Sequence, residues 1–299
     1  MTLHVALELG GGRDPADIEA LARAAAAAEE AGVALVTLAD EPIGGGARIE
    51  AGVRAAFLAR RTARIGLAPQ LHVTATEPFH LATQLASLDH ASLGRAAWVV
   101  GAANTEEALA TIGRAPLDAA GLRREVDDVI DVARRLWDSW EDDAVIRDVP
   151  SGRFLDRDRV HHVNFEGATF SIAGPLITPR PPQGQLVVLG ADTLGVTGRL
   201  DVALVGDGPI DEVRRRAELA RAEGAPLVFA DVAGPRPLPE LLAALDGVVD
   251  GVRLHPAAPD DDLAWLSTVD KPPLRATLRE TLGLPRPENR YATTGRETA

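Results

Sequence analysis

Short apolar runs alternate with longer amphipathic segments along most of the chain. Eight runs have the length and apolar content of buried strands, at residues 3–9, 33–39, 64–73, 95–101, 186–190, 202–205, 226–231 and 247–254. Most of them are apolar at nearly every position. This indicates strands that are buried on both faces, as in a parallel sheet.

Segments with helical character separate these runs. They lie at residues 15–31, between the loop 44–46 and residue 60, and at residues 78–90, 122–140, 209–221, 238–245 and 274–282. Eight strand–helix units predict an α/β fold, the (β/α)8 TIM barrel. A doubly wound open sheet is the alternative. It would need a nucleotide-binding fingerprint after the first strand, and Gly10-Gly11-Gly12 is not the G-x-G-x-x-G motif.

One segment interrupts the alternation. Residues 141–184 are polar and rich in Pro, Gly and Arg, with β-like pieces at 160–165 and 168–172. They are too many for a barrel loop, so we expect an insertion between the fourth helix and the fifth strand of a single domain, residues 1–292. Long ordered loops are usually lids or contact surfaces. We expect residues 293–299 to form a disordered tail.

Composition narrows the function classes. The 299 residues are 46% apolar and 25% charged, as in a globular protein with a sizeable core. A net charge of −13 argues against binding nucleic acid or an anionic membrane. The absence of cysteine excludes disulfides, thiolate nucleophiles and cysteine-ligated metals. With no leader-like start and no run of 18 apolar residues, we expect a cytoplasmic protein.

Polar residues gather where the expected strands end, which is where the active site of a barrel lies. In chain order they are Asp40, His72, Thr74, Asn104, Asp192, Thr193, Asp207, Asp231 and His255. Each has a plain structural alternative. The carboxylates can cap helices or turns, and the histidines can be hydrogen-bonded rim residues.

The sequence supports no built metal or hydrolase site. Acidic rims can hold Mg²⁺, but no H-x-H or H-E-x-x-H spacing accompanies this one. His161 and His162 are adjacent, so on a strand they would face opposite ways. There is no G-x-S-x-G elbow, and aromatic residues at 4% offer few surfaces for stacking sugars. We therefore expect no metal and predict no catalytic residue.

Several strings resemble bacterial-luciferase-like flavin monooxygenases. TEPFHLA at residues 76–82 and LDHASLGR at 88–95 are similar to the third helix and fourth strand of that family. Four others resemble the narrower branch with nitrilotriacetate and dibenzothiophene-sulfone monooxygenases: LWDSWEDDA at 136–144, HHVNFEG at 161–167, GPLITPRPPQ at 174–183 and LRETLGLPRPENRYA at 278–292. The resemblance implies the same barrel, with residues 141–184 as the insertion of the family.

The resemblance also implies cofactors and partners. These enzymes use O2 and reduced FMN, supplied by a separate reductase, to oxygenate small organic substrates. The cofactor carries the oxidative chemistry, so the missing cysteines and metal motifs are no obstacle. We expect the insertion to help cover the flavin. We also expect a homodimer through helices near the second and third strands, where residues 55–59 form an apolar patch that core packing explains equally well.

Five residues carry the expected flavin site. Asp40 matches the acidic residue beside the flavin ring, and His72 and Thr74 lie at the next strand end. Asp192 and Thr193 match the position after the fifth strand where the family holds the FMN phosphate with serines. The carboxylate of Asp192 would cost phosphate affinity unless a cation intervenes.

Three other positions depart from the family pattern. Val99 replaces an Asn, and Asp118 and Leu122 replace a His and a Tyr. The groups left for the phosphate are a helix expected after Thr193, His72, and Arg48 or Arg253. The alternative to an enzyme is therefore a homologue on the same barrel that does not bind flavin and acts as a binding or partner protein. A deazaflavin-dependent enzyme is a third possibility.

Overall fold

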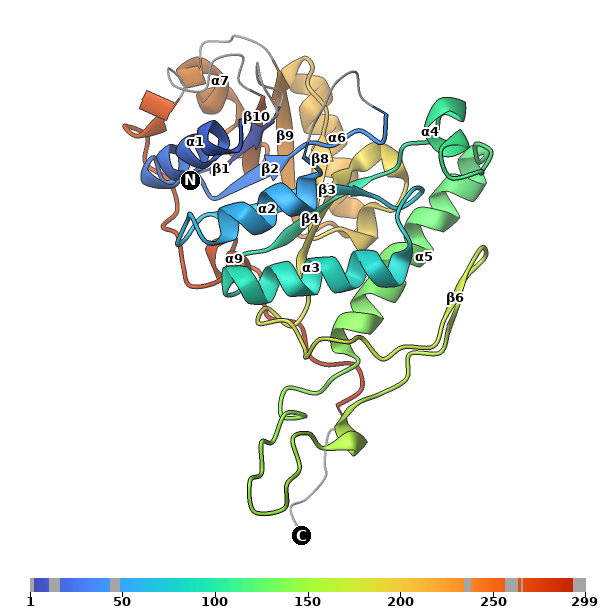
Figure 1. Ribbon diagram of the computed structural model, residues 1–299. Coiled ribbons are helices and arrows are strands. Elements are labelled where there is room, and N and C mark those ends of the chain that lie inside the picture. The colour runs from blue at the N-terminus through green and yellow to red at the C-terminus, as the bar shows by residue number, and fades with distance from the viewer. Residues whose placement is uncertain are drawn as a thin grey trace.

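Eight parallel strands close into a barrel in a computed structural model, which describes residues 3–10, 17–43, 49–233, 238–255, 263–264 and 266–292. Around the barrel the order is β1-β10-β9-β8-β7-β4-β3-β2 (Figure 1). The strands are β1 (His4–Leu9), β2 (Leu35–Leu38), β3 (Gly66–His72), β4 (Ala97–Gly101), β7 (Val187–Ala191), β8 (Val202–Val205), β9 (Leu227–Ala233) and β10 (Gly251–His255). The predicted TIM barrel is confirmed, and the open sheet is excluded.

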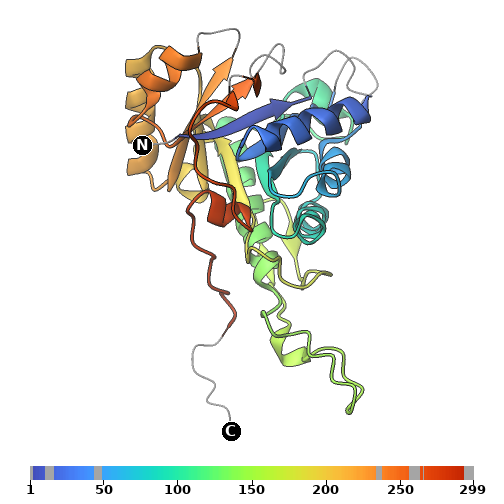
Figure 2. The ribbon, with the colours of Figure 1, turned by 90° about the vertical axis from the view of Figure 1, so that its left-hand side faces the viewer.

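Helices cover the outside of this barrel (Figures 1 and 2). They are α1 (Ile18–Glu30), α2 (Ala51–Ala59), α3 (Pro78–Ser92), α4 (Glu106–Ala110), α5 (Ala119–Asp138), α6 (Ile210–Ala222), α7 (Leu238–Leu245) and α9 (Leu278–Thr281). Local capping sets the ends of α3. The Glu77 carboxylate accepts hydrogen bonds from the first free N–H groups, Pro78 opens the helix, and Leu93 ends it in the left-handed region.

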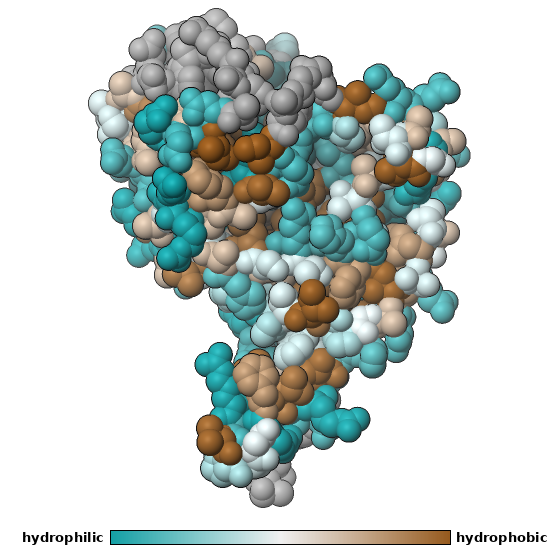
Figure 3. Space-filling model, in the orientation of Figure 1, coloured by the Kyte–Doolittle hydropathy of each residue, from teal (hydrophilic) through white to brown (hydrophobic). Residues whose placement is uncertain are grey.

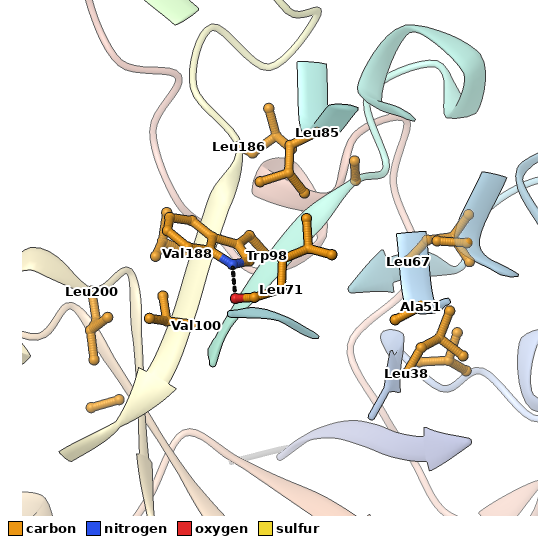
Figure 4. Packing of buried hydrophobic residues seen from close by; sticks show 14 of the residues in the cluster. Leu38, Ala51, Leu67, Leu71, Leu85, Trp98, Val100, Leu186, Val188 and Leu200 are labelled. Atoms are coloured by element: carbon orange, nitrogen blue, oxygen red, sulfur yellow. Dashed lines mark hydrogen bonds between the residues drawn. The ribbon is translucent and has the colours of Figure 1, made fainter. Parts of the chain in front are cut away.

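Alternate residues of each strand enter two different cores. Val99, Leu189 and Phe229 are among those that fill the barrel interior, whereas Trp98 points outward among the helices. The indole N–H of Trp98 donates to the Leu71 carbonyl at 3.1 Å (Figure 4). This alternation follows from the two-residue period of a strand, and it explains why nearly every strand position is apolar.

The connection from β7 to β8 contains no α-helix. Residues 192–201, all of which the structure describes, form two 3₁₀ turns, η2 (Asp192–Leu194) and η3 (Thr197–Arg199). The expected helix after Thr193 is therefore wrong. The segment is shorter than the dozen or so residues that a helical crossover needs, so it returns directly along the outside of the barrel.

The insertion leaves the barrel between α5 and β7. It forms a projecting arm with one 3₁₀ turn, η1 (Arg157–Arg159), and a short antiparallel pair, β5 (Phe165–Glu166) and β6 (Ser171–Ile172) (Figures 1 and 2). The insertion leaves and re-enters the barrel at the end where the strands start, because α5 ends and β7 begins there, but the tip of the β5–β6 pair lies beside α5, where the Ala168 N–H donates to Asp128 at 2.8 Å. That the insertion helps to cover the flavin stays a prediction, because the Thr169 hydroxyl donates to Glu125, near the start of α5 on the rim side of the barrel.

Buried ion pairs fix the arm and the C-terminal segment to the barrel. Arg180 donates to the carboxylate of Asp138 from Nε at 3.1 Å and from Nη2 at 3.0 Å, and both side chains are almost fully buried. The Asn289 amide donates to the carbonyls of Asp138 and Trp140. Residues 293–299, expected to be a tail, lie outside the described residues. No helix in the described part of the chain has the length and apolar character of a membrane-spanning segment.

Candidate functional site

The carboxyl ends of β2, β3, β4 and β7 form one arc of the barrel rim, because these four strands are neighbours. Asp40 follows β2, His72 and Thr74 lie at the end of β3, and Asp192 and Thr193 follow β7. The fold therefore brings the five predicted residues to one side of the rim.

Asp40 fixes the loop after β2 to the start of α2. Its Oδ2 accepts the Ala51 backbone N–H at 2.7 Å, and its Oδ1 accepts that of Glu41 at 3.0 Å. Its own backbone N–H donates to the Gln70 side chain at 3.3 Å. Glu50 is the N-cap of α2, and the Asp40 carboxylate accepts the first N–H group of this helix and so shapes the rim at this point.

His72 and Thr74 tie neighbouring rim loops together. The Ala103 N–H donates to His72 Nδ1 at 3.0 Å, so the proton lies on Nε2, which donates to the Asp40 carbonyl at 2.9 Å. The Thr74 hydroxyl donates to the Ala103 carbonyl at 2.6 Å. A Cβ on Gly101 would lie 2.6 Å from the His72 ring, so only glycine fits there. The polar atoms of both side chains are thus already engaged.

A hollow of about 300 Å³ opens beside these residues. Its described lining includes the carboxylates of Asp40, Glu41 and Glu50, the amide of Gln70, and no cation. Such a site suits a neutral ring with hydrogen-bonding groups and repels a phosphate. The described residues place no three His, Asp or Glu side chains where they would hold a metal ion.

A cation lies beside Asp192, as phosphate binding next to this carboxylate would require. Arg216 of α6 forms a two-pronged ion pair with its carboxylate, with Nε at 2.8 Å from Oδ2. Hydrogen bonding to Asp192 raises the pKa of the Arg216 guanidinium. Thr193 is exposed beside this pair. Sequence reasoning missed Arg216, although the helix after β8 necessarily lies next to the end of β7 in a barrel.

The opposite arc of the rim holds a second polar network. Arg253 of β10 donates to both carboxylate oxygens of Asp231, at 2.6 and 2.7 Å, and His255 Nε2 lies 3.3 Å from the same carboxylate. Burial acts to raise the pKa of Asp231, but the hydrogen bonds from His255 and Arg253 outweigh it and hold this pKa below its usual range. Glu8, which the sequence did not single out, lies 3.8 Å from Arg253 and accepts the Thr37 hydroxyl.

The positions that depart from the family pattern have structural roles. Val99 lies in the barrel interior, and Asp118 caps α5 by accepting the Gly121 N–H. Leu122 packs partly buried against the helical core. Arg253 is engaged by Asp231, and Arg48 lies outside the described residues.

Known proteins resemble this chain over most of its length. The sequence model of the family described as "Luciferase-like monooxygenase" matches residues 2–238. One of the subunits of pristinamycin IIA synthase from Streptomyces pristinaespiralis is 34% identical over 284 residues, which are 93% of this chain and 94% of that protein.

Other matches are partial or structural. N-acetyl-S-(2-succino)cysteine monooxygenase of Bacillus subtilis is 42% identical over 139 residues, 46% of this chain and 32% of that protein, so the match spans about a third of the relative. The structure of EDTA monooxygenase from Chelativorans sp. BNC1 superposes with a TM-score of 0.78 at 20% identity, covering 96% of this chain and 99% of that one. At this identity the likeness concerns the fold alone.

Proposed function

The chain belongs to the luciferase-like monooxygenase family, and on this premise we propose that it is the oxygenating component of a monooxygenase that uses reduced FMN and O2 on a small organic substrate. The observation that carries the proposal is the family match, because residues 2–238 include strands β1 to β9 and therefore most of the rim. When bound, reduced FMN supplies the electrons for the reduction of O2.

The arc formed by β2, β3, β4 and β7 would hold the flavin. The hollow beside Asp40 and Gln70 offers carboxylate and amide groups to the polar edge of the ring. His72 and Thr74 act indirectly, because they hold the loops after β2 and β4 in place. The network around Asp231 and Arg253 faces the ring from the opposite arc, where the substrate would bind.

Two protein partners belong to this proposal. A separate flavin reductase supplies reduced FMN, and a second copy of the chain forms a homodimer. In the patch at residues 55–59, Ala55, Leu58 and Ala59 are buried in the core, whereas Val53 on the same helix is 55% exposed. The arm offers more apolar surface for contact with another chain (Figure 3): Ile146, Val149 and Phe154 are all exposed.

A second candidate function rests on the relative that matches over its whole length, since its name makes it one component of a multi-chain synthase. The chain would then be a subunit that binds no flavin and completes a two-chain enzyme. The apolar side chains at Val99 and Leu122, where the family has polar groups, favour this alternative.

Flavin binding separates the two functions. Purified protein is titrated with FMN, and anaerobically with reduced FMN, and fluorescence quenching and thermal unfolding are followed. Binding to the folded state stabilises it by about 2.7 kcal/mol when the ligand is at a hundred times its Kd. We expect quenching and a rise in Tm. Neither change at high micromolar flavin would overturn the enzyme and favour the non-catalytic component.

A further inference from the structure

The mouth of the barrel is polar on the arc formed by β9, β10, β1 and β2, which are neighbours in the sheet. Deeper in the barrel, the inward positions of these strands hold apolar side chains such as Ala6, Leu35 and Phe229. The inward positions nearer the mouth follow at intervals of two residues. They form a polar layer that consists of Glu8, Thr37, Asp231, Arg253 and His255.

Asp231 is the centre of the polar layer, because two other members donate to its carboxylate. Arg253 binds both oxygens, with Nε at 2.6 Å from Oδ1 and Nη2 at 2.7 Å from Oδ2. His255 Nε2 lies 3.3 Å from Oδ1. Burial opposes ionisation of this carboxylate, but its two donors hold the pKa of Asp231 below the usual range. An ionised carboxylate accepts hydrogen bonds and donates none, so the proton of neutral His255 lies on Nε2.

The other ring nitrogen of His255 is open. Nδ1 carries a lone pair in this tautomer, and it forms no hydrogen bond with any described residue. The side chain is 32% exposed, so a molecule in the mouth of the barrel can reach it. The pair therefore has the arrangement in which a carboxylate orients an imidazole that acts as a base.

All seven histidines of the chain lie within the described residues, and His255 differs from the others. His72, also at the rim, has both ring nitrogens engaged, by the Ala103 N–H and the Asp40 carbonyl. The remaining five lie outside the mouth: His4 at the start of β1, His80 and His90 on α3, and His161 and His162 in the insertion. His255 thus combines a place at the mouth with a ring nitrogen that can accept a proton.

The charges that face His255 can accommodate that proton. Asp231 on β9, Glu8 on β1 and Arg253 on β10 leave one negative charge in excess. The two carboxylates share the guanidinium, since Arg253 Nη1 lies 3.8 Å from Glu8 Oε2. A proton on His255 makes the polar layer neutral, and opposite charges attract each other more strongly in a partly buried site than in water.

We propose that His255 is a general base on the substrate side of the rim, and that Asp231 positions its ring. The inference rests on the proposed function and deepens it, because it names the substrate class: a molecule that presents an N–H, or a C–H next to a carbonyl group, to Nδ1. The bond from that atom to hydrogen breaks, the bond between Nδ1 and hydrogen forms, and the electron pair stays on the substrate, which is then oxidised. Reduced FMN and O2 supply the oxidant, and the imidazolium returns its proton to water.

The tautomer of His255 tests the geometry. In flavin-free protein with isotope-labelled histidine, nitrogen NMR distinguishes the two tautomers, and the variant H255Q identifies the signal. We expect His255 to carry its proton on Nε2 alone. In D231N the amide can both donate and accept, so the same signal should become that of a mixture of tautomers. A merely structural role of Asp231 would lower the Tm of D231N and leave the tautomer unchanged.

The reactivity of Nδ1 tests the base itself. Nitrobenzisoxazole is a probe that needs no flavin: a base removes its C–H proton, the electron pair forms a nitrile, the N–O bond breaks and a coloured phenolate is released. We expect the wild-type protein to accelerate this elimination, and H255Q to lose at least about tenfold of the acceleration. H80Q is the matched control, because it removes an exposed histidine on α3, and it should change the rate by less than about twofold.

The outcomes separate the inference from the proposed function. Equal elimination rates in wild type and H255Q, or a His255 proton on Nδ1, would overturn the base. A single tautomer that persists in D231N would overturn the positioning role of Asp231. Neither measurement contains flavin, so these results leave the FMN titration as an independent test of the enzyme. If FMN does not bind while H255Q loses the acceleration, the base stands and its assignment to an oxidation fails together with the proposed function.

Discussion

At the end of the barrel where the strands begin, Asp89 and Asp138 are fully buried and each is held by several donors, whereas the carboxylates of Asp40, Asp192 and Asp231 at the carboxyl ends of the strands are partly exposed. Asp138 shows the first arrangement, with two bonds from Arg180 and one from Gln185 at 2.7 Å. Asp192 shows the second, with Arg216 alone. The first kind of end fixes architecture, and the second leaves groups that a ligand can reach.

The strings that resemble the family lie mostly at the first end. LWDSWEDDA contributes Asp138, PRPPQ contributes Arg180 and Gln183, and the C-terminal string contributes Arg279 and Asn289. Arg180 donates to the Asp138 carboxylate, and the Asn289 amide donates to the Asp138 backbone carbonyl. The Gln183 amide donates to Asp89, and the Gln183 Oε1 accepts the Arg279 N–H. These motifs therefore report how the arm and the C-terminal segment are attached. They carry no information on the rim at the carboxyl ends of the strands, where this chain departs from the pattern.

The largest loss of stability should follow from removing the Arg180 guanidinium, at the end of the barrel where the strands begin. Arg180→Met leaves Asp138 as a buried charge without its cation, which costs about 3–5 kcal/mol. Urea unfolding of the variant measures this loss. Arg286→Met is the control, because Arg286 pairs with the half-exposed Asp142 and should cost less than about 1 kcal/mol. Equal losses in the two variants would mean that burial of the Asp138 carboxylate does not increase its dependence on Arg180.

A steric change at the rim should lower the free energy of unfolding by an intermediate amount. In Gly101→Ala the new methyl group would lie 2.6 Å from the His72 ring, which must move away from its bonds to Asp40 and Ala103. Overpacking of this kind costs about 1–3 kcal/mol, and FMN affinity should fall as well because the loops after β2 and β4 separate. Gly208→Ala, which meets no atom within 4 Å, should change neither quantity. An unaltered FMN affinity in the Gly101 variant would mean that His72 does not shape the site.

The sequence predicted the barrel better than the rim for physical reasons. Strand burial is a local property, so runs such as residues 202–205 could be inferred from neighbouring residues. The pairs Asp192–Arg216 and Asp231–Arg253 join residues 24 and 22 positions apart, and only the closed barrel brings them together. The missing helix was predictable in principle, since residues 192–201 are too few for one.

Removing the negative charge beside the expected phosphate position should strengthen FMN binding. Asp192→Ser removes the carboxylate and frees the Arg216 guanidinium beside the loop after β7. We expect FMN affinity to rise about tenfold, equivalent to roughly 1.4 kcal/mol, and riboflavin affinity to stay constant. Asp211→Asn removes an equal charge from the exposed first turn of α6 and should change FMN affinity by less than about twofold. An unchanged or weaker affinity in the Asp192 variant would show that the phosphate does not bind near this loop.

The smallest effect concerns a carboxylate at the first end. Burial raises the pKa of Asp89 to about 6, although hydrogen bonds from Gln183 and Ala96 and the nearby His90 oppose the shift. This pKa lies above the unfolded value of 3.8, so the folded state binds the proton more tightly. Stability from Asp89 therefore increases as the pH falls from 7 to 5, by about 1 kcal/mol.

Asp89→Asn removes this titration, and other groups, such as His4 with its lowered pKa, remain in both proteins. The difference in free energy of unfolding between wild type and variant isolates the contribution of Asp89. It should shift in favour of wild type by about 1 kcal/mol between pH 7 and pH 5. The rim carboxylate Asp231, whose pKa lies below its usual range, should show the opposite sign, and only at lower pH. A difference that is flat over this interval would mean that Asp89 titrates like an exposed carboxylate, and the contrast between the two ends would lose its electrostatic basis.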